Sequence, residues 1–175
     1  MRLAIMLAGL IAPALILTAC SGGNETKTSA APPAPTETPE QVVRRLYAME
    51  HAPSTPTEMQ SLFTSDLAAA LVPATGRSAI DWDYRFDERD AVPSNYSFTF
   101  RPRSRLTSRV VVHFQNRSVA DSMFYDLCLR QDGQWRIRDI VDPDSGGVSI
   151  RPIMHLDIVR AADCPSAVPA AAVGN

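Results

Sequence analysis

The sequence predicts an α+β domain over residues 39–164, with N-terminal helices packed on an antiparallel sheet and a short C-terminal helix. Up to Leu71, apolar residues recur every three or four positions, as in helices that bury one face. From Tyr96 onward the apolar period is two, which is typical of strands with one face in a core. Asp132-Gly133, between two such strands, is a strong short-range signal of a β-hairpin. Helices followed by paired strands define the α+β class.

Two helical segments are expected before the strands. The first begins after Thr38, where Pro39 in the first turn and Gln41 three positions beyond the cap form a capping box. Its apolar stripe consists of Val42, Val43, Leu46 and Tyr47. The second segment runs from about Thr57 to Leu71, and Ser65 inside it predicts a division into two short helices.

Alternation predicts the strands that follow. The alternating residues are Tyr96, Phe98 and Phe100, then Val110, Val112 and Phe114, then Met123, Tyr125, Leu127 and Leu129. Trp135 and Ile137 share a face in the next strand, but Ile140 breaks the alternation, which predicts a β-bulge or the end of that strand. A last helix is expected between Ser149, its N-cap, and Ala162.

The N-terminal segment has the composition of a secretory signal peptide over residues 1–19. Arg2 precedes a mostly apolar run of 15 residues that ends at Leu17, whereas a spanning helix needs roughly 20. Leu17-Thr18-Ala19-Cys20 resembles the lipobox of bacterial lipoproteins. The resemblance implies a diacylglyceryl group on Cys20, cleavage before it, and acylation of the freed amine with a fatty acid such as palmitate. Because Ser21 rather than aspartate follows, it implies the periplasmic face of the outer membrane, or the cell membrane surface in a cell with one membrane.

Two further segments are predicted to be disordered. Residues 20–38 form a proline-rich and glycine-rich tether after the lipidated cysteine, and residues 165–175 form a tail of the same kind. The whole chain has 17 basic and 19 acidic residues. This near balance argues against a nucleic-acid partner, which requires a clustered basic face.

Cys128 and Cys164 remain once Cys20 is assigned to lipid. In an oxidising compartment the two are predicted to form a disulfide; two unrelated buried thiols are the alternative. There is no CxxC spacing and no histidine at metal-ligand spacing, so neither a cofactor nor a metal is expected.

The densest group of acids and aromatics covers residues 81–90. Asp81, Trp82, Asp83, Tyr84 and Asp90 are the candidate binding lip, in which aromatic side chains alternate with acids at the edge of a cavity. A calcium loop is excluded, because its sixth position would be Phe86 instead of glycine and its twelfth Val92 instead of glutamate. The alternative is a structural loop whose aromatics cap the core while Arg85 and Arg89 neutralise its acids.

Three motifs together resemble the nuclear-transport-factor-two-like superfamily. They are Leu62–Leu71 (LFTSDLAAAL), the Asp81-Trp82-Asp83 element followed by Asp90, and the hairpin that ends in Trp135–Ile140 (WRIRDI). This chain has Arg89 where relatives often have glutamine before the last aspartate. The resemblance implies a strongly curved, cone-like sheet around a long helix, within a domain that is uncharacterised in bacterial lipoproteins.

Isomerases and dehydratases of that superfamily keep an acid or a histidine inside the cone as a base. Asp126 and His113 are the candidates here, but alternation places both on the face opposite Val112 and Leu127. No catalytic residue is therefore assigned.

The expected function is that of a non-enzymatic, membrane-tethered lipoprotein that binds a protein or a small amphiphile, as a monomer or a homodimer. One alternative is an immunity or inhibitor protein that blocks an envelope-targeting toxin. Another is an enzyme of the cone-pocket isomerase or dehydratase type.

Overall fold

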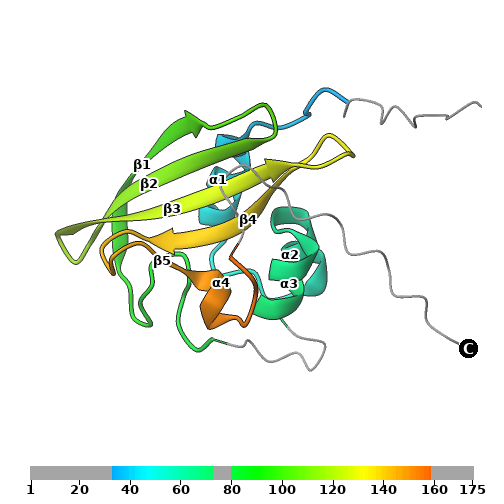
Figure 1. Cartoon of the computed structure of the whole chain (residues 1–175). Coiled ribbons are helices and arrows are strands. Elements are labelled where there is room, and N and C mark those ends of the chain that lie inside the picture. The colour runs from blue at the N-terminus through cyan, green and yellow to red at the C-terminus, as the bar shows by residue number, and fades with distance from the viewer. Residues whose placement is uncertain (1–32, 73–79, 159–175) are drawn as a thin grey trace, which may run out of the picture. The chain divides into compact units, whose positions relative to one another are not determined.

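Three short helices precede a five-stranded antiparallel sheet, and a fourth helix follows it (Figure 1). The computed structural model describes residues 33–72 and 80–158, all within one compact unit. The helices are α1 (Pro39–Tyr47), α2 (Pro56–Leu62), α3 (Ser65–Leu71) and α4 (Ile150–Ile153). The strands are β1 (Pro93–Pro102), β2 (Thr107–Asn116), β3 (Val119–Leu129), β4 (Trp135–Asp142) and β5 (Val148–Ser149), adjacent in chain order. The predicted α+β class is confirmed.

The first helix starts as its sequence predicts. The Thr38 amide donates to the Gln41 side-chain oxygen at 2.7 Å, and the Gln41 amide donates to the Thr38 hydroxyl at 3.2 Å. Thr55 and Glu58 form a second capping box at the start of α2. The predicted division of the second segment is also confirmed, but the N-cap of α3 is Thr64, one residue before Ser65. The chain breaks there because the Thr64 amide donates to the Ile137 carbonyl of β4 at 2.8 Å.

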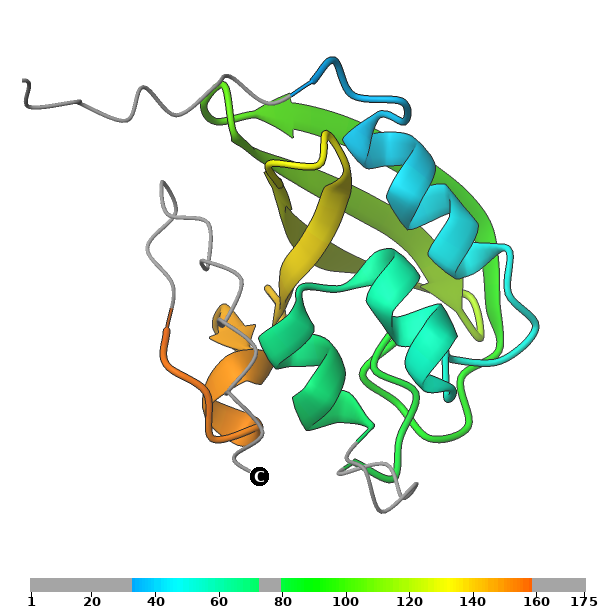
Figure 2. The same cartoon turned by 90° about the vertical axis from the view of Figure 1, so that its right-hand side faces the viewer.

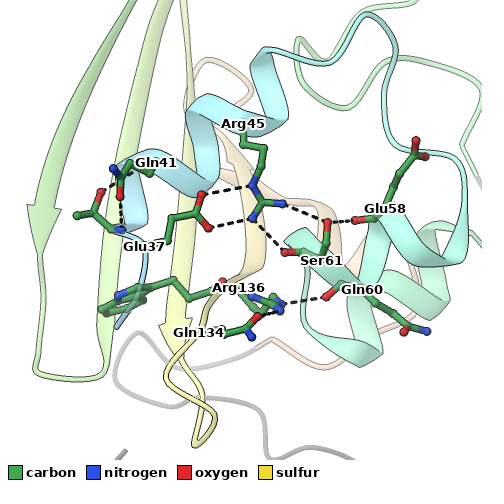
Figure 3. A network of polar contacts seen from close by, with 10 residues as sticks. Glu37, Gln41, Arg45, Glu58, Gln60, Ser61, Gln134 and Arg136 are labelled. Atoms are coloured by element: carbon green, nitrogen blue, oxygen red, sulfur yellow. Dashed lines mark hydrogen bonds and ion pairs between the residues drawn. The ribbon is translucent and has the colours of Figure 1, made fainter. Parts of the chain in front are cut away.

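Arginines hold the helices to one another and to the hairpin. Arg45 on α1 donates to the Glu37 carboxylate at 3.0 and 3.3 Å and to the Ser61 hydroxyl on α2 at 3.2 Å (Figure 3). Arg136 on β4 donates to the Gln60 carbonyl at 2.9 Å. Glu37 and Thr38 therefore contact α1, although both belong to the segment predicted as tether.

The sheet contains the predicted hairpin and the predicted bulge. Gly133 has a φ of 77°, which glycine adopts without a steric penalty, and its amide donates to the Arg130 carbonyl at 3.0 Å. Asp126 pairs with Asp139 while Leu127 pairs with Ile137, so Arg138 is the extra residue of β4. The bulge explains the broken alternation, because it lets Ile137 and Ile140 both reach the core.

The core lies between the helices and one face of the sheet. Helix α1 contacts β1, β2 and β4, whereas α2 and α4 contact β4, and Figure 2 shows α1 to α3 on the same side of the sheet. The strands contribute Val110, Val112, Phe114, Met123, Tyr125 and Leu127 to the core, which confirms the predicted core faces of β2 and β3. Tyr96 and Phe100 of β1 are instead 40% and 44% exposed. This strand is at the edge of the sheet, where α1 covers its face incompletely.

The C-terminal helix is shorter than predicted. Ser149 caps α4 as expected, since its hydroxyl accepts from the Arg151 amide at 3.1 Å. The helix ends at Ile153, because the chain turns at His155, whose φ of 58° is left-handed. Residues 159–162 of the predicted helix lie outside the described residues. Within residues 33–72 and 80–158, no helix has the length and apolar character needed to cross a bilayer.

Candidate functional site

Four of the five predicted lip residues line one pocket. The loop 80–92, between α3 and β1, places Asp81, Trp82, Asp83 and Tyr84 around a cavity of about 620 Å³. Asp90 is exposed and does not line the cavity. The opposite walls come from the end of α1, the segment 49–54 and the start of β1.

Arg85 fixes the lip to the rest of the domain. Its guanidinium donates to the Asp83 carboxylate at 2.6 to 3.1 Å and to the Met49 carbonyl at 2.7 Å. Its own carbonyl accepts from the Tyr47 hydroxyl at 2.8 Å and from the Tyr125 hydroxyl at 3.4 Å. Asp83, two residues away in the sequence, thus orients the Arg85 side chain. Through these contacts Arg85 connects the loop 80–92 to α1 and β3. The sequence showed the arginine two positions after the acid, but gave no sign of the distant carbonyl and hydroxyl groups.

Aromatic rings form the apolar wall of this pocket. Tyr47, the last residue of α1, makes edge-to-face contacts with Phe86, Tyr96, Phe98 and Tyr125, with ring centroids 5.3 to 5.8 Å apart. Tyr47 and Tyr96 both line the cavity, and sequence reasoning assigned neither to the site. Their periodicity indicated core positions, and only the end of the helix and the edge of the sheet leave them accessible.

Trp82 lies between this pocket and a second cavity of about 320 Å³. The second cavity extends to Met123, Ile140 and Ile150. The Trp82 indole nitrogen is buried and makes no hydrogen bond of standard geometry with the described residues. Asp87 lies beside it: burial and the nearby Asp142 carboxyl raise the pKa of Asp87, and the indole N–H opposes this effect.

The charged and phenolic groups of the pocket are held in defined states. Asp81 pairs with Arg89, and Asp83 pairs with Arg85. Burial raises the pKa of Tyr47 and Tyr84, which line the pocket, well above the usual value of a phenol, and does the same for Tyr125, whose hydroxyl is hydrogen-bonded to that of Tyr47. All three hydroxyls therefore stay protonated at neutral pH. The pocket can therefore enclose an apolar body and offer hydrogen bonds at its edge.

The two candidate bases lie on the face of the sheet opposite the core, as predicted. Asp126 is buried and accepts two hydrogen bonds of 2.7 Å from Arg109, while His113 is exposed. Neither residue lines the pocket. The burial of Asp126 was not predicted, because alternation places the face of a side chain without showing what covers it.

The cysteines are tested only in part. Cys128 is fully buried on β3, whereas Cys20 and Cys164 lie outside the described residues. Lipid attachment and the disulfide therefore stay predictions. Within residues 33–72 and 80–158, no group of three histidine, cysteine or acidic residues is placed to hold a metal ion.

Comparisons with models of protein families, with curated proteins and with solved structures found no match for this chain. What the structure itself defines is an α+β domain with an aromatic-walled pocket at one end of its sheet.

Proposed function

We propose that this chain is a periplasmic lipoprotein, tethered through Cys20, whose cone-like α+β domain binds a small amphiphilic ligand without catalysing a reaction. The observation that carries the proposal is the pocket formed by the predicted lip. Its volume of about 620 Å³ falls within the usual range for small-molecule sites, roughly 300–1,000 Å³.

The chemistry of the pocket supports an amphiphilic ligand. Tyr47, Tyr96 and Trp82 supply apolar ring surface, while Asp81 and Arg89 supply a charged edge. An apolar body with one polar head matches this arrangement.

The states of the ionisable groups favour binding over catalysis. A general base must accept a proton near neutral pH. Asp83 is committed to the buried Arg85 guanidinium, and the Tyr47 hydroxyl has a strongly raised pKa. The isomerase alternative needs an acid or histidine held against the bound ligand, and its candidates Asp126 and His113 lie on the other side of the sheet. His51 and Glu50 do line the pocket, but their side chains are 86% and 90% exposed, so the protein does not hold either of them in a fixed position.

The binding test compares two aromatic residues of the same strand and the same face. Tyr96 and Phe100 are 40% and 44% exposed, but only Tyr96 lines the pocket. With the fluorescent amphiphile N-phenyl-1-naphthylamine as the probe, Tyr96→Ala should weaken binding about fivefold to tenfold. Phe100→Ala should leave the affinity within about twofold. Equal losses in both variants would contradict binding in this pocket.

The anchor is tested separately. Cys20→Ala should abolish labelling with radioactive palmitate and release the protein from the outer membrane fraction, since stable anchoring needs two acyl chains or an equivalent second signal. Wild-type protein that fails to incorporate palmitate would contradict the lipoprotein assignment and leave the pocket proposal intact.

The exposed edge of the sheet favours a protein partner as a second candidate. Strand β1 is ten residues long, mostly exposed, and pairs only with β2 in the described part of the chain. An extended segment of another protein, or a second copy, could add to such an edge. The Arg103 amide donates to the Thr107 carbonyl of β2, and successive amides of a strand point in opposite directions, so the Phe100 amide points to the free edge. Replacing Phe100 with proline would remove this edge donor and block the pairing. An unchanged oligomeric state and unchanged partner capture in Phe100→Pro would therefore contradict this candidate.

A further inference from the structure

Basic residues gather in the connection between β1 and β2. Residues 91–120 contain five arginines and no acidic residue. Arg101, Arg103 and Arg105 lie at the end of β1 and in the turn that follows, and Leu106 beside them is 41% exposed. This part of the surface can therefore bind anionic groups through its arginines and apolar groups through Leu106.

Few acids neutralise this end of the sheet. Arg109 pairs with Asp126, and Arg103 is 3.7 Å from the same carboxylate. Within the described ranges, Arg101 and Arg105 have no acidic group within 4.0 Å. Asp132, in the neighbouring turn between β3 and β4, pairs with Arg130, so the net charge of this end is positive.

The other end of the sheet is acidic. The antiparallel order places the loop 80–92, the start of β3 and the end of β4 there, away from the β1–β2 turn (Figure 1). Its eight acids outnumber its three arginines, Arg85, Arg89 and Arg117; the acids are Asp81, Asp83, Asp87, Glu88, Asp90, Asp121, Asp142 and Asp144. The pocket opens at this acidic end, since the lip and the start of β1 line it.

The described chain begins at the basic end. A Cβ on Gly133 would lie 2.8 Å from the Pro33 side chain, so Pro33 sits against the turn between β3 and β4. That turn adjoins the β1–β2 connection, because the Leu129 amide donates to the Leu106 carbonyl at 2.9 Å. Residues 21–32 separate Pro33 from Cys20, and their covalent reach is at most about 45 Å.

We propose that Arg101, Arg103, Arg105 and Leu106 form a docking surface for the anionic phospholipid headgroups of the membrane that holds the anchor. The inference rests on the proposed attachment at Cys20. Guanidinium groups bind phosphate oxygens in a bidentate manner, and each arginine near an anionic surface strengthens association about fivefold. The acidic end is repelled by the same surface, so the pocket opens away from the bilayer.

The test uses the mature lipidated protein in two kinds of vesicle, one of phosphatidylcholine alone and one with about a third phosphatidylglycerol. Flotation reports the anchor, and hydrogen exchange of residues 101–107 reports the docking surface. We expect flotation with both vesicles, but slower exchange of residues 101–107 only with phosphatidylglycerol. The protection should disappear in about 1 M salt, where the Debye length is about 3 Å.

A matched pair of variants checks the assignment. Replacing Arg101, Arg103 and Arg105 together with glutamine should abolish the protection, whereas Arg117→Gln, on the exposed turn at the opposite end, should retain it. Equal exchange on both vesicles overturns the docking surface while the anchor stands; if exchange is fast on both, an acidic protein becomes the partner to consider. If the protein does not float with phosphatidylcholine vesicles, the anchor is overturned. If it also fails to float with the vesicles that contain phosphatidylglycerol, the docking surface is overturned as well.

Discussion

Replacement of Arg85 should unfold the lip and destabilise the whole domain. The Arg85 side chain is 5% exposed and bonds to Asp83 and to the Met49 carbonyl. Removing one partner of a buried ion pair costs about 3–5 kcal/mol. Because the Asp83 side chain keeps 23% of its surface in water, we expect the lower limit of about 3 kcal/mol for Arg85→Met. For a domain of this size, that corresponds to a fall in Tm of about 9–15 °C.

Arg89→Met is the matched control, because Arg89 also pairs with an acid of the lip but its side chain is 67% exposed. An exposed pair contributes about 0–1 kcal/mol, so its loss should lower the Tm by about 5 °C at most. Thermal and urea unfolding of both variants and of wild type are monitored by circular dichroism in the same detergent. If Arg85→Met and Arg89→Met lowered the Tm equally, the burial of Arg85 would not determine the stability of the lip.

Three further predictions test other parts of the fold. Burial, with a smaller contribution from Asp126, raises the pKa of Asp139 on folding, so the stability from its protonated form is lost as pH rises above about 4. The Tm of Asp139→Asn relative to that of wild type should therefore increase between pH 4 and 7. A difference in Tm that stays constant over this range would argue against the linkage. Thr38→Ala removes the cap of α1 and should cost about 1 kcal/mol in urea unfolding, while Thr36→Ala, outside the capping box, should cost nothing measurable. If Cys128 and Cys164 form the predicted disulfide, which would stabilise the fold by about 4 kcal/mol, thiol counting on denatured, unreduced protein should find neither of them reactive. Two reactive thiols would refute the disulfide.

The fold could be predicted where periodicity and turn chemistry act locally. The Thr38 capping box, the Asp132-Gly133 hairpin and the core face of β2 follow from neighbouring residues, and the structure confirms all three. The exposure of Phe100 could not be read in this way. Alternation assigns a side chain to a face, but the helix that covers the face is distant in sequence.

In the candidate site too, local features could be predicted and contacts between residues distant in sequence could not. The lip was recognisable because its acids and aromatics are contiguous in the sequence. Tyr47 and Tyr96 are 49 residues apart in the sequence, yet their ring centroids lie 5.3 Å apart. They join the pocket only because α1 ends over the first residues of β1. No local pattern encodes that arrangement, since the rest of both elements reads as ordinary core.

The bulge at Arg138 connects the two faces of the sheet. Without the extra residue, strict alternation would place Ile140 on the face of Asp126. With it, Ile140 pairs with Tyr125 in the core and lines the cavity next to Trp82, while Asp139 comes directly opposite Asp126. Two adjacent buried carboxylates repel each other unless each has its own partner. Arg109 binds Asp126, and the Ser149 hydroxyl donates to Asp139 at 2.8 Å. The inserted residue thus brings Ile140 into the lining of the second cavity and also brings two carboxylates together on the opposite face. Arg109 and Ser149 offset the repulsion between these carboxylates.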